Sequence, residues 1–117
     1  MTATVSSHTL DGTDGTHAGG IAVRLVNLTT GAEVFATRMD AGGRLAQAVD
    51  LAGADPADRY EISFATGAYW RARGIAHDRL IEEVVLRFAM PDPDARYHMP
   101  LILSPNGYSC WASIPER

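Results

Sequence analysis

Residues 97–111 read Tyr-His-Met-Pro-Leu-Ile-Leu-Ser-Pro-Asn-Gly-Tyr-Ser-Cys-Trp, and this stretch decides the fold that we predict. In its first half, polar and apolar residues alternate, and the sequence then becomes continuously apolar. This pattern is typical of a strand whose one face lines a site while the other enters a core. Ser-Pro-Asn-Gly at residues 104–107 is a concentrated turn signal, and a second strand follows from Tyr108. The stretch therefore predicts a hairpin that carries one imidazole, that of His98, among apolar residues.

Short strand patterns separated by turn residues fill the rest of the chain. Residues 21–28 alternate between apolar and other residues, and residues 66–74 predict one short helix that Thr66 caps and Gly74 ends. Further strands are expected at residues 5–10, 33–39, 44–51, 60–65 and 81–90, with loops at residues 11–20 and 91–94. About eight short strands joined by frequent turns are typical of an all-β sandwich.

Length and composition exclude several classes of protein. The chain has 117 residues, which predicts a single domain over residues 1–117, with 46% hydrophobic and 21% charged residues. Its formal net charge of −4 disfavours binding to nucleic acid, which needs a basic surface. No apolar run approaches the ~20 residues of a membrane helix, and the amino terminus lacks a secretory signal pattern. We therefore expect a cytoplasmic protein that binds neither nucleic acid nor membranes.

The residues that could carry chemistry are few. His8 and His98 lie on expected strands, whereas His17 and His77 lie in polar loops and are expected to be solvated surface residues. The chain has a single cysteine and lacks His-x-His and His-x-x-x-His pairs, so we expect no metal site and no cofactor. Arg44 follows the glycine turn at residues 40–43, which aims it either into a site or into solvent.

Two further readings stay open at this level. Cys110 is either a nucleophile activated by a histidine or, more simply, a packed residue of the second hairpin strand. Arg71 and Arg73 lie on the short helix, where a solvated helix face is the simpler interpretation.

Four segments resemble the transthyretin-like family and, within it, the 5-hydroxyisourate hydrolases. Residues 7–11 resemble the family motif Ser-x-His-Val-Leu-Asp, and residues 40–44 resemble its Asn-Ala-Asp-Gly-Arg turn, with Gly42 in place of the aspartate. Residues 67–75 resemble the short helix of the family, and residues 97–105 resemble the specific signature Tyr-His-Val-Pro-Leu-Leu-Leu-Ser-Pro. The resemblance extends over essentially the whole chain.

The resemblance implies a transthyretin-like sandwich of two four-stranded sheets with one short helix. It also implies a homotetramer, a dimer of dimers, with sites in a channel where dimers meet and no cofactor. The catalytic histidine pair and arginine of the family fall on His8, His98 and Arg44. We expect Tyr108, Trp111 and Ile102 to form apolar walls for a small heterocyclic substrate.

The carboxyl terminus departs from that pattern. Hydrolases of the family end in Tyr-Arg-Gly-Ser, whose arginine and serine enter the site, whereas residues 111–114 here read Trp-Ala-Ser-Ile and three more residues follow. The first hypothesis is a hydrolase of 5-hydroxyisourate in urate catabolism, or of another cyclic amide or ureide in specialised metabolism. The alternative is a tetramer that binds a small molecule without catalysis. A purely structural module ranks last, because it would not need two histidines on strands.

Overall fold

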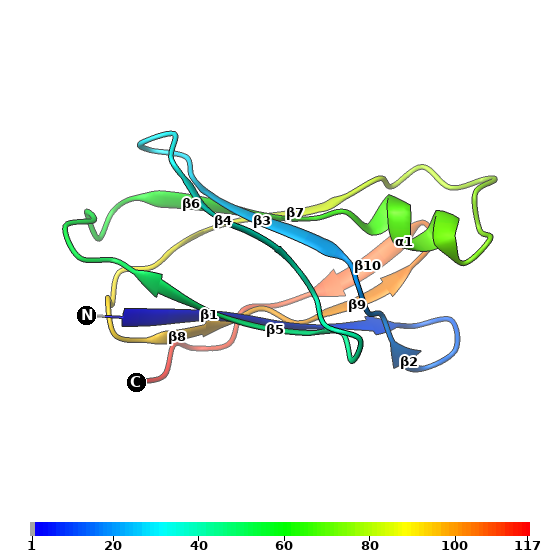
Figure 1. Cartoon of the computed structure of the whole chain (residues 1–117), viewed down its shortest axis with the longest axis horizontal. Helices are drawn as coiled ribbons and strands as arrows, with labels where there is room; N and C mark the ends of the chain where they lie inside the picture. The colour runs from blue at the N-terminus through cyan, green and yellow to red at the C-terminus, as the bar shows by residue number, and fades with distance from the viewer. Residues whose placement is uncertain (1) are drawn as a thin grey trace.

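The computed structural model describes residues 2–117, and it consists of strands with one short helix (Figure 1). The elements in chain order are β1 (Thr2–Asp11), β2 (Thr16–His17), β3 (Ala22–Asn27), β4 (Glu33–Arg38), β5 (Arg44–Asp50), β6 (Arg59–Phe64), α1 (Thr66–Ala72), β7 (Val84–Ala89), β8 (Arg96–His98), β9 (Leu101–Ser104) and β10 (Gly107–Cys110).

Two sheets face each other, and β1 is the centre of the sheet that carries the predicted site. Strand β5 pairs with β1 in antiparallel orientation along one edge, and β8 and then β9 pair with β1 in parallel orientation along the other. Strands β8 and β9 are two pieces of one line, interrupted at residues 99–100, where proline has no N–H to donate. Strand β10 continues this sheet beside β9, and β2 adds a short hairpin to the end of β1. The second sheet has the order β4-β3-β6-β7.

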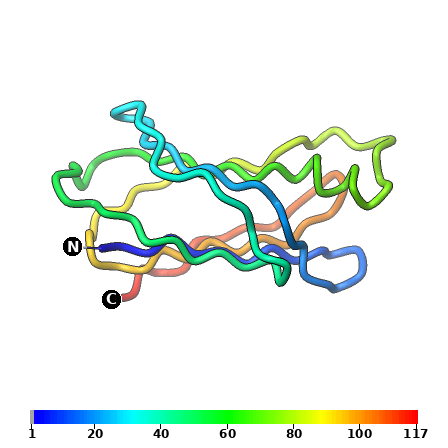
Figure 2. The backbone as a smooth tube through the Cα atoms, in the orientation of Figure 1, coloured from blue at the N-terminus to red at the C-terminus, as the bar shows by residue number. Residues whose placement is uncertain are grey.

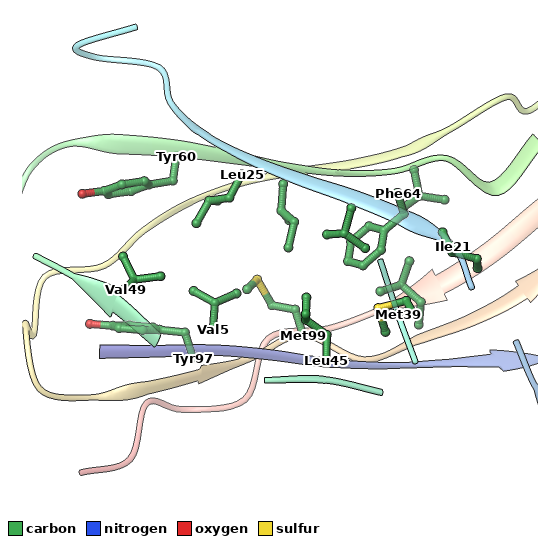
Figure 3. Close-up of a cluster of buried hydrophobic side chains, with 14 of the residues drawn as sticks. Val5, Ile21, Leu25, Met39, Leu45, Val49, Tyr60, Phe64, Tyr97 and Met99 are labelled. Carbon is green, nitrogen blue, oxygen red and sulfur yellow. The ribbon is translucent and has the colours of Figure 1, made fainter. Parts of the chain in front are cut away.

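The core lies between the two sheets, and this arrangement confirms the predicted sandwich. The sheet centred on β1 has six strands rather than the expected four, because β8 and β9 are separate strands and β2 is added. The tube of Figure 2 shows the two layers, and the side chains in Figure 3 point from each layer into the space between them. Leu25, Ile62 and Phe64 from one sheet are fully buried, as are Val5 and Leu101 from the other. Each such side chain contributes about 1.5–3 kcal/mol by leaving water.

The prediction that Thr66 caps the helix is wrong. Helix α1 begins at Thr66, its N-cap residue is Ala65, and no side chain makes a capping hydrogen bond. The reason is that the Gly67 N–H donates to the Glu82 carbonyl oxygen at 2.8 Å, so the loop before β7 takes the place of a cap. The Thr66 hydroxyl is buried without a hydrogen-bond partner among the described residues. The helix ends at Ala72 with Arg73 as its C-cap residue, and Gly74, which was predicted to end it, follows with a φ of 79°.

Two boundaries also differ from the sequence patterns. The strand expected at residues 81–90 begins only at Val84, because the buried Arg79 guanidinium binds the Ile81 carbonyl oxygen at 2.7 Å and the Glu82 carboxylate at 3.1 Å. The region expected to be a loop at residues 11–20 contains β2, which turns the chain back onto β1. Within residues 2–117, no helix is long and apolar enough to cross a membrane.

Candidate active site

The three predicted catalytic residues lie on the outer face of the sheet centred on β1, the face that points away from the core. His8 of β1 is the register partner of Arg44 of β5, and Ser6 of β1 is the partner of His98 of β8. Partners across a ladder project from the same face, and so do residues two apart on one strand. His8, Arg44 and His98 therefore share one face on three adjacent strands, and the small side chains of Ser6 and Ala46 lie between them.

The alternation of β1 creates this face. Its inward residues include Val5, Ser7 and Thr9, which are all buried. The two inward hydroxyls are satisfied because Ser7 Oγ donates to the Met99 carbonyl oxygen at 2.7 Å and Thr9 Oγ1 donates to the Ala18 carbonyl oxygen at 2.6 Å. Since successive side chains of a strand point to opposite faces, burial of these residues turns His8 outward.

The turn at residues 40–43 fixes the position of Arg44. The Asp40 carboxylate accepts a hydrogen bond from the Arg44 backbone N–H at 2.9 Å, and Gly43 has a φ of 71°. A Cβ at Gly43 would lie 2.5 Å from the Thr9 carbonyl oxygen, so β1 packs directly on the turn backbone. The Arg44 guanidinium forms no ion pair with the carboxylates of residues 2–117, which leaves its charge available to a ligand.

A second imidazole contacts His8, and sequence reasoning did not find it. His17 Nδ1 lies 2.9 Å from His8 Nε2. Burial, followed by the positive charges of Arg44, His17 and His98, holds the pKa of His8 below its ordinary value of 6.5, and a hydrogen bond with the Gly42 backbone opposes this shift. The His17 side chain is exposed, as predicted, but its contact with His8 was not predicted. The Asp-Gly pair at residues 14–15 is the signal of a tight hairpin that would have placed His17 beside β1.

His98 has a different environment at the other end of the face. Its Nδ1 lies 2.9 Å from Ser6 Oγ, and its backbone carbonyl oxygen accepts a hydrogen bond from the Ser113 N–H at 3.0 Å. Its Nε2 has no hydrogen-bond partner among the described residues. His98 thus presents one ring nitrogen to the protein and leaves the other for a ligand or for water.

Two adjoining cavities meet at His98. One, of about 270 Å³, is lined by residues that include Arg44, Ala46 and His98. The other, of about 240 Å³, lies between His98 and the carboxyl-terminal residues Ser113 and Ile114. Ser6, His98 and Arg96 line both cavities, whereas His8 lines neither of them. Guanidinium, imidazole and hydroxyl groups over a floor of small side chains suit a small ligand with carbonyl and N–H groups.

The residues after β10 fold back along β8 on the outside of the sheet (Figure 1). Arg96 and Glu116 exchange backbone hydrogen bonds as an isolated antiparallel bridge. The Arg117 guanidinium binds Asp92 at 2.7 Å and lies 3.7 Å from Asp94. The tail, which we define as residues 111–117, therefore forms one wall of the His98 cavity.

The three predicted apolar wall residues do not join His98 in these cavities. Ile102 is on the outer face, since its neighbours in β9, Leu101 and Leu103, are buried. Tyr108 is the register partner of Leu103, so it projects from the same inward face as Leu103, opposite to Ile102, at the edge of the sheet. Ile102 and Tyr108 instead line a separate shallow cavity with Gly12. The Trp111 side chain, just beyond β10, is half exposed.

The remaining candidates have structural surroundings. Burial raises the pKa of the Cys110 thiol, which is the opposite of what an activated nucleophile needs. Arg71 binds Glu82 at 2.8 Å, and Arg73 binds the buried Asp11 at 2.9 Å, so these helix residues form ion pairs with the loop before β7 and with β1. Within residues 2–117, no three His, Cys, Asp or Glu residues are grouped so as to hold a metal ion.

Comparison with known proteins identifies the family and agrees with the fold. The model of the HIUase/Transthyretin family matches residues 5–112. A 5-hydroxyisourate hydrolase of Mesorhizobium japonicum is 35% identical over 112 residues, which cover 92% of this chain and 89% of that protein. The structure of Klebsiella pneumoniae 5-hydroxyisourate hydrolase has a TM-score of 0.77 at 28% identity and covers 96% of this chain and 99% of that one. Sea bream transthyretin in complex with thyroxine has a TM-score of 0.75 at 27% identity, covering 94% of each chain.

Proposed function

The chain belongs to the HIUase/transthyretin family, and from this premise we propose that it is a hydrolase that opens a cyclic amide or ureide of the 5-hydroxyisourate type. The observation that carries the proposal is the common face of His8, Arg44 and His98, with cavities beside Arg44 and His98. Hydrolysis of such a ring needs a group that moves a proton and a group that stabilises an oxyanion. An imidazole can perform the first task and a guanidinium the second.

His98 is the general base of the proposed reaction. With Ser6 Oγ accepting a hydrogen bond from the Nδ1–H of His98, the lone pair of the ring is on Nε2, which has no partner among the described residues. Nε2 takes a proton from water while the water oxygen adds to the ring carbonyl carbon. The C–N bond then breaks, and the proton on Nε2 passes to the leaving nitrogen. One water molecule is added and nothing is oxidised or reduced.

Arg44 stabilises the oxygen anion of the intermediate, and His8 supports it from the neighbouring strand. The guanidinium has no carboxylate partner within residues 2–117, and a single well-placed donor of this kind contributes about 10²-fold or more to the rate. His8 is the register partner of Arg44, and its lowered pKa favours the neutral imidazole, which places no second positive charge beside the guanidinium.

Arg96 replaces the cation that the tail no longer provides. The hydrolase pattern has an arginine where this chain has Ala112, and Arg96 lines both cavities beside His98. Its guanidinium forms no ion pair with a carboxylate of the described chain. The Arg96 guanidinium enters the cavity from β8, whereas the arginine of the hydrolase pattern belongs to the tail. Since the positive charge lies at a different position, the proposed substrate is either 5-hydroxyisourate or a related cyclic ureide of different shape.

We place the working site in a homotetramer. The outer face is open in the single chain, and the exposed Ile102, Trp111 and Ile114 provide apolar surface. A second copy lying over this face would exclude water from His98 and Arg44, which strengthens their electrostatic effect. Light scattering coupled to size-exclusion chromatography tests this assembly, and a monomer would contradict it.

A second candidate function is binding of a small heterocycle without catalysis. The tail sequence Trp-Ala-Ser-Ile favours it, and so does the similarity to transthyretin, which nearly equals the similarity to a hydrolase in TM-score. The two functions differ in their dependence on His98. Substitution of His98 by alanine abolishes turnover by an enzyme but leaves the ligand affinity of a carrier nearly intact.

The decisive experiment follows isourate itself. Purified protein is added to urate and urate oxidase while the transient isourate absorbance is recorded, together with His98→Asn and, as a control, the exposed loop variant His77→Asn. We expect the wild type and His77→Asn to accelerate the decay and His98→Asn to lose the effect. Unchanged decay with the wild type would exclude isourate as substrate, and equal activity of His98→Asn would exclude the proposed base.

A further inference from the structure

The contact between His17 and His8 is not explained by the fold or by the resemblance. We propose that His17 is a positioning residue of the site, which holds the His8 imidazole through an Nδ1–Nε2 hydrogen bond and shares a proton with it. The pairing itself is independent of the proposed hydrolysis, and only its effect on turnover rests on the proposed function.

The geometry of the two rings supports a hydrogen bond rather than a chance contact. His17 is the register partner of Leu10, so it is the diagonal neighbour of His8 on the outer face. The nitrogen atoms are 2.9 Å apart, the ring centroids are 5.0 Å apart and the ring planes differ by 27°. The 2.9 Å separation of the nitrogens is within hydrogen-bond range, so the two rings meet through their nitrogens as well as lying nearly parallel.

The hairpin that carries His17 is fixed to the molecule on both sides of it. Before it, Thr16 donates its N–H and its hydroxyl to the Asp14 carboxylate, which also binds Arg73 of the helix end at 2.6 Å. After it, the Ala18 N–H donates to the Thr9 carbonyl oxygen at 2.9 Å. His17 is therefore held in place by its neighbours in the chain although its own side chain is exposed.

The turn that presents Arg44 interlocks with the same hairpin. A Cβ at Gly19 would lie 2.5 Å from the Ala41 carbonyl oxygen, and a Cβ at Gly43 would lie 3.1 Å from the Ala18 carbonyl oxygen. Such close backbone packing leaves no room for the hairpin to shift relative to Arg44. His17 thus belongs to the same rigid unit as Arg44, which is the requirement for a residue that positions a site group.

The hydrogen bond limits the number of protons that the two rings can carry together. An N–H···N bond needs one proton between the two nitrogens, so the pair can be neutral or singly charged but not doubly charged. The charged or titratable groups that face the pair are Arg44 from β5 and His98 from β8, while Asp14 beside the hairpin is occupied by Arg73. The Arg44 guanidinium disfavours a second proton on the pair, so the bond persists at neutral pH and breaks in acid.

For the reaction, this arrangement separates the roles of the two strand histidines. His8 Nε2 is occupied by His17 and a hydrogen bond joins His8 to the Gly42 backbone, whereas His98 Nε2 is free. His8 is thereby kept in one orientation beside Arg44, and His98 moves the proton. Loss of His17 frees the His8 ring, so kcat falls while KM changes little.

The test compares His17→Ala and His17→Asn with the wild type, with His77→Ala as the control for removal of an exposed histidine. Nuclear magnetic resonance of the imidazole nitrogens reports the tautomer and the titration of His8 in each protein. In the wild type we expect His8 to show a single tautomer, with its Nε2 in a hydrogen bond to His17. In His17→Ala we expect His8 to titrate alone at a higher pH, and His77→Ala should leave it unchanged. Titration of His8 that is identical in the wild type and in His17→Ala would overturn the pairing.

Turnover provides the second measurement. We expect kcat of His17→Ala to fall about tenfold, the size of effect seen when a partner that orients a functional imidazole is removed. The asparagine amide can donate to His8 Nε2, so His17→Asn restores part of kcat, whereas a merely structural role would not distinguish the two variants. Equal kcat in all variants would overturn the positioning role. If the wild type has no turnover, the proposed function fails, and the resonance measurement alone still decides the pairing.

Discussion

The two ends of the outer face are built in different ways. The turn end, which we define as residues 8–20 and 40–44, is interlocked by backbone packing at Gly19 and Gly43 and holds His8 between neighbours. The tail end is defined as residues 96–98 and the tail. Its strand β8 is paired with β1, whereas the tail itself is held by backbone hydrogen bonds to β8 and by the exposed Arg117–Asp92 ion pair. The turn end is therefore rigid, and the tail can change its side chains with little cost to the fold.

This difference suggests that the turn end holds residues needed for the reaction itself, while the tail determines which substrate the site prefers. A change at the turn end disturbs contacts of the backbone and thus the fold itself. A change in the tail alters only the walls of the His98 cavity, because its exposed ion pairs contribute little to stability. The larger departure from the hydrolase pattern lies in the tail, where the fold tolerates it, and the turn end departs at Gly42.

The largest expected effect comes from exchanging the two strand histidines for asparagine in turn. His98→Asn removes the proposed base, and removal of a general base costs about 10²–10⁴-fold in rate. His8→Asn leaves Nε2 of His98 free and should cost less. Measurement of kcat for both variants tests the assignment, and a greater loss in His8→Asn would reverse the roles of the two ends.

A substitution in the glycine turn measures the rigidity of the turn end. Gly43→Ala places a side chain at positive φ and 2.5 Å from the Thr9 carbonyl oxygen, and the backbone conformation alone costs about 1–3 kcal/mol. Its neighbour is a matched control, because a Cβ at Gly42 would meet only Asp40 Oδ1, at 3.4 Å. Urea unfolding should show a large loss of stability for Gly43→Ala and little for Gly42→Ala. Similar losses would mean that the turn is not interlocked with β1.

Substitution of Arg96 tests the tail end. Arg96→Gln removes the guanidinium that lines both cavities, and the loss of a hydrogen bond to a charged group corresponds to about a tenfold rise in KM. The control is Arg59→Gln, an exposed arginine of β6 on the other sheet. Steady-state kinetics should show the rise for Arg96→Gln with kcat retained. An unchanged KM would indicate that Arg96 does not touch the substrate.

The sequence predicts the strands well because alternation is a local property. The pattern around Val5 and the hairpin after Tyr97 both reflect burial of every second residue. The meeting of His8 with Arg44 depends on the register of β1 with β5, which no local pattern encodes, and it was expected only from the resemblance. His17 was missed because its hairpin is hidden in a stretch rich in glycine and aspartate.

The path of the tail was beyond prediction for another reason. It depends on a contact between Arg117 and Asp92, and the loop that carries Asp92 has no regular pattern from which its position follows. The predicted cap at Thr66 failed similarly, since the carbonyl oxygen of Glu82 replaced it from a distant part of the chain. Local propensities could not anticipate either contact, because both depend on tertiary neighbours.

The smallest expected effect is the dependence of stability on pH at the turn end. Burial and the charges of Arg44 and His17 lower the pKa of His8 below 6.5 in the folded protein. The unfolded chain therefore takes up the proton first as the pH falls, so stability that is present above pH 6.5 is lost as the pH passes through the lowered folded value. Lowered carboxylate pKa values, such as that of Asp14 at about 2, act only in stronger acid.

Urea midpoints measured between about pH 8 and about pH 5 test this prediction. We expect the midpoint of the wild type to fall across this range and that of His8→Asn to fall less, while the exposed control His77→Asn follows the wild type. His17→Asn should lie between them, because it removes one of the charges that lower the pKa of His8 but leaves Arg44 and burial in place. Parallel curves of midpoint against pH for the wild type and His8→Asn would mean that the surroundings of His8 do not lower its pKa. The turn end and the tail end would then differ only in their packing.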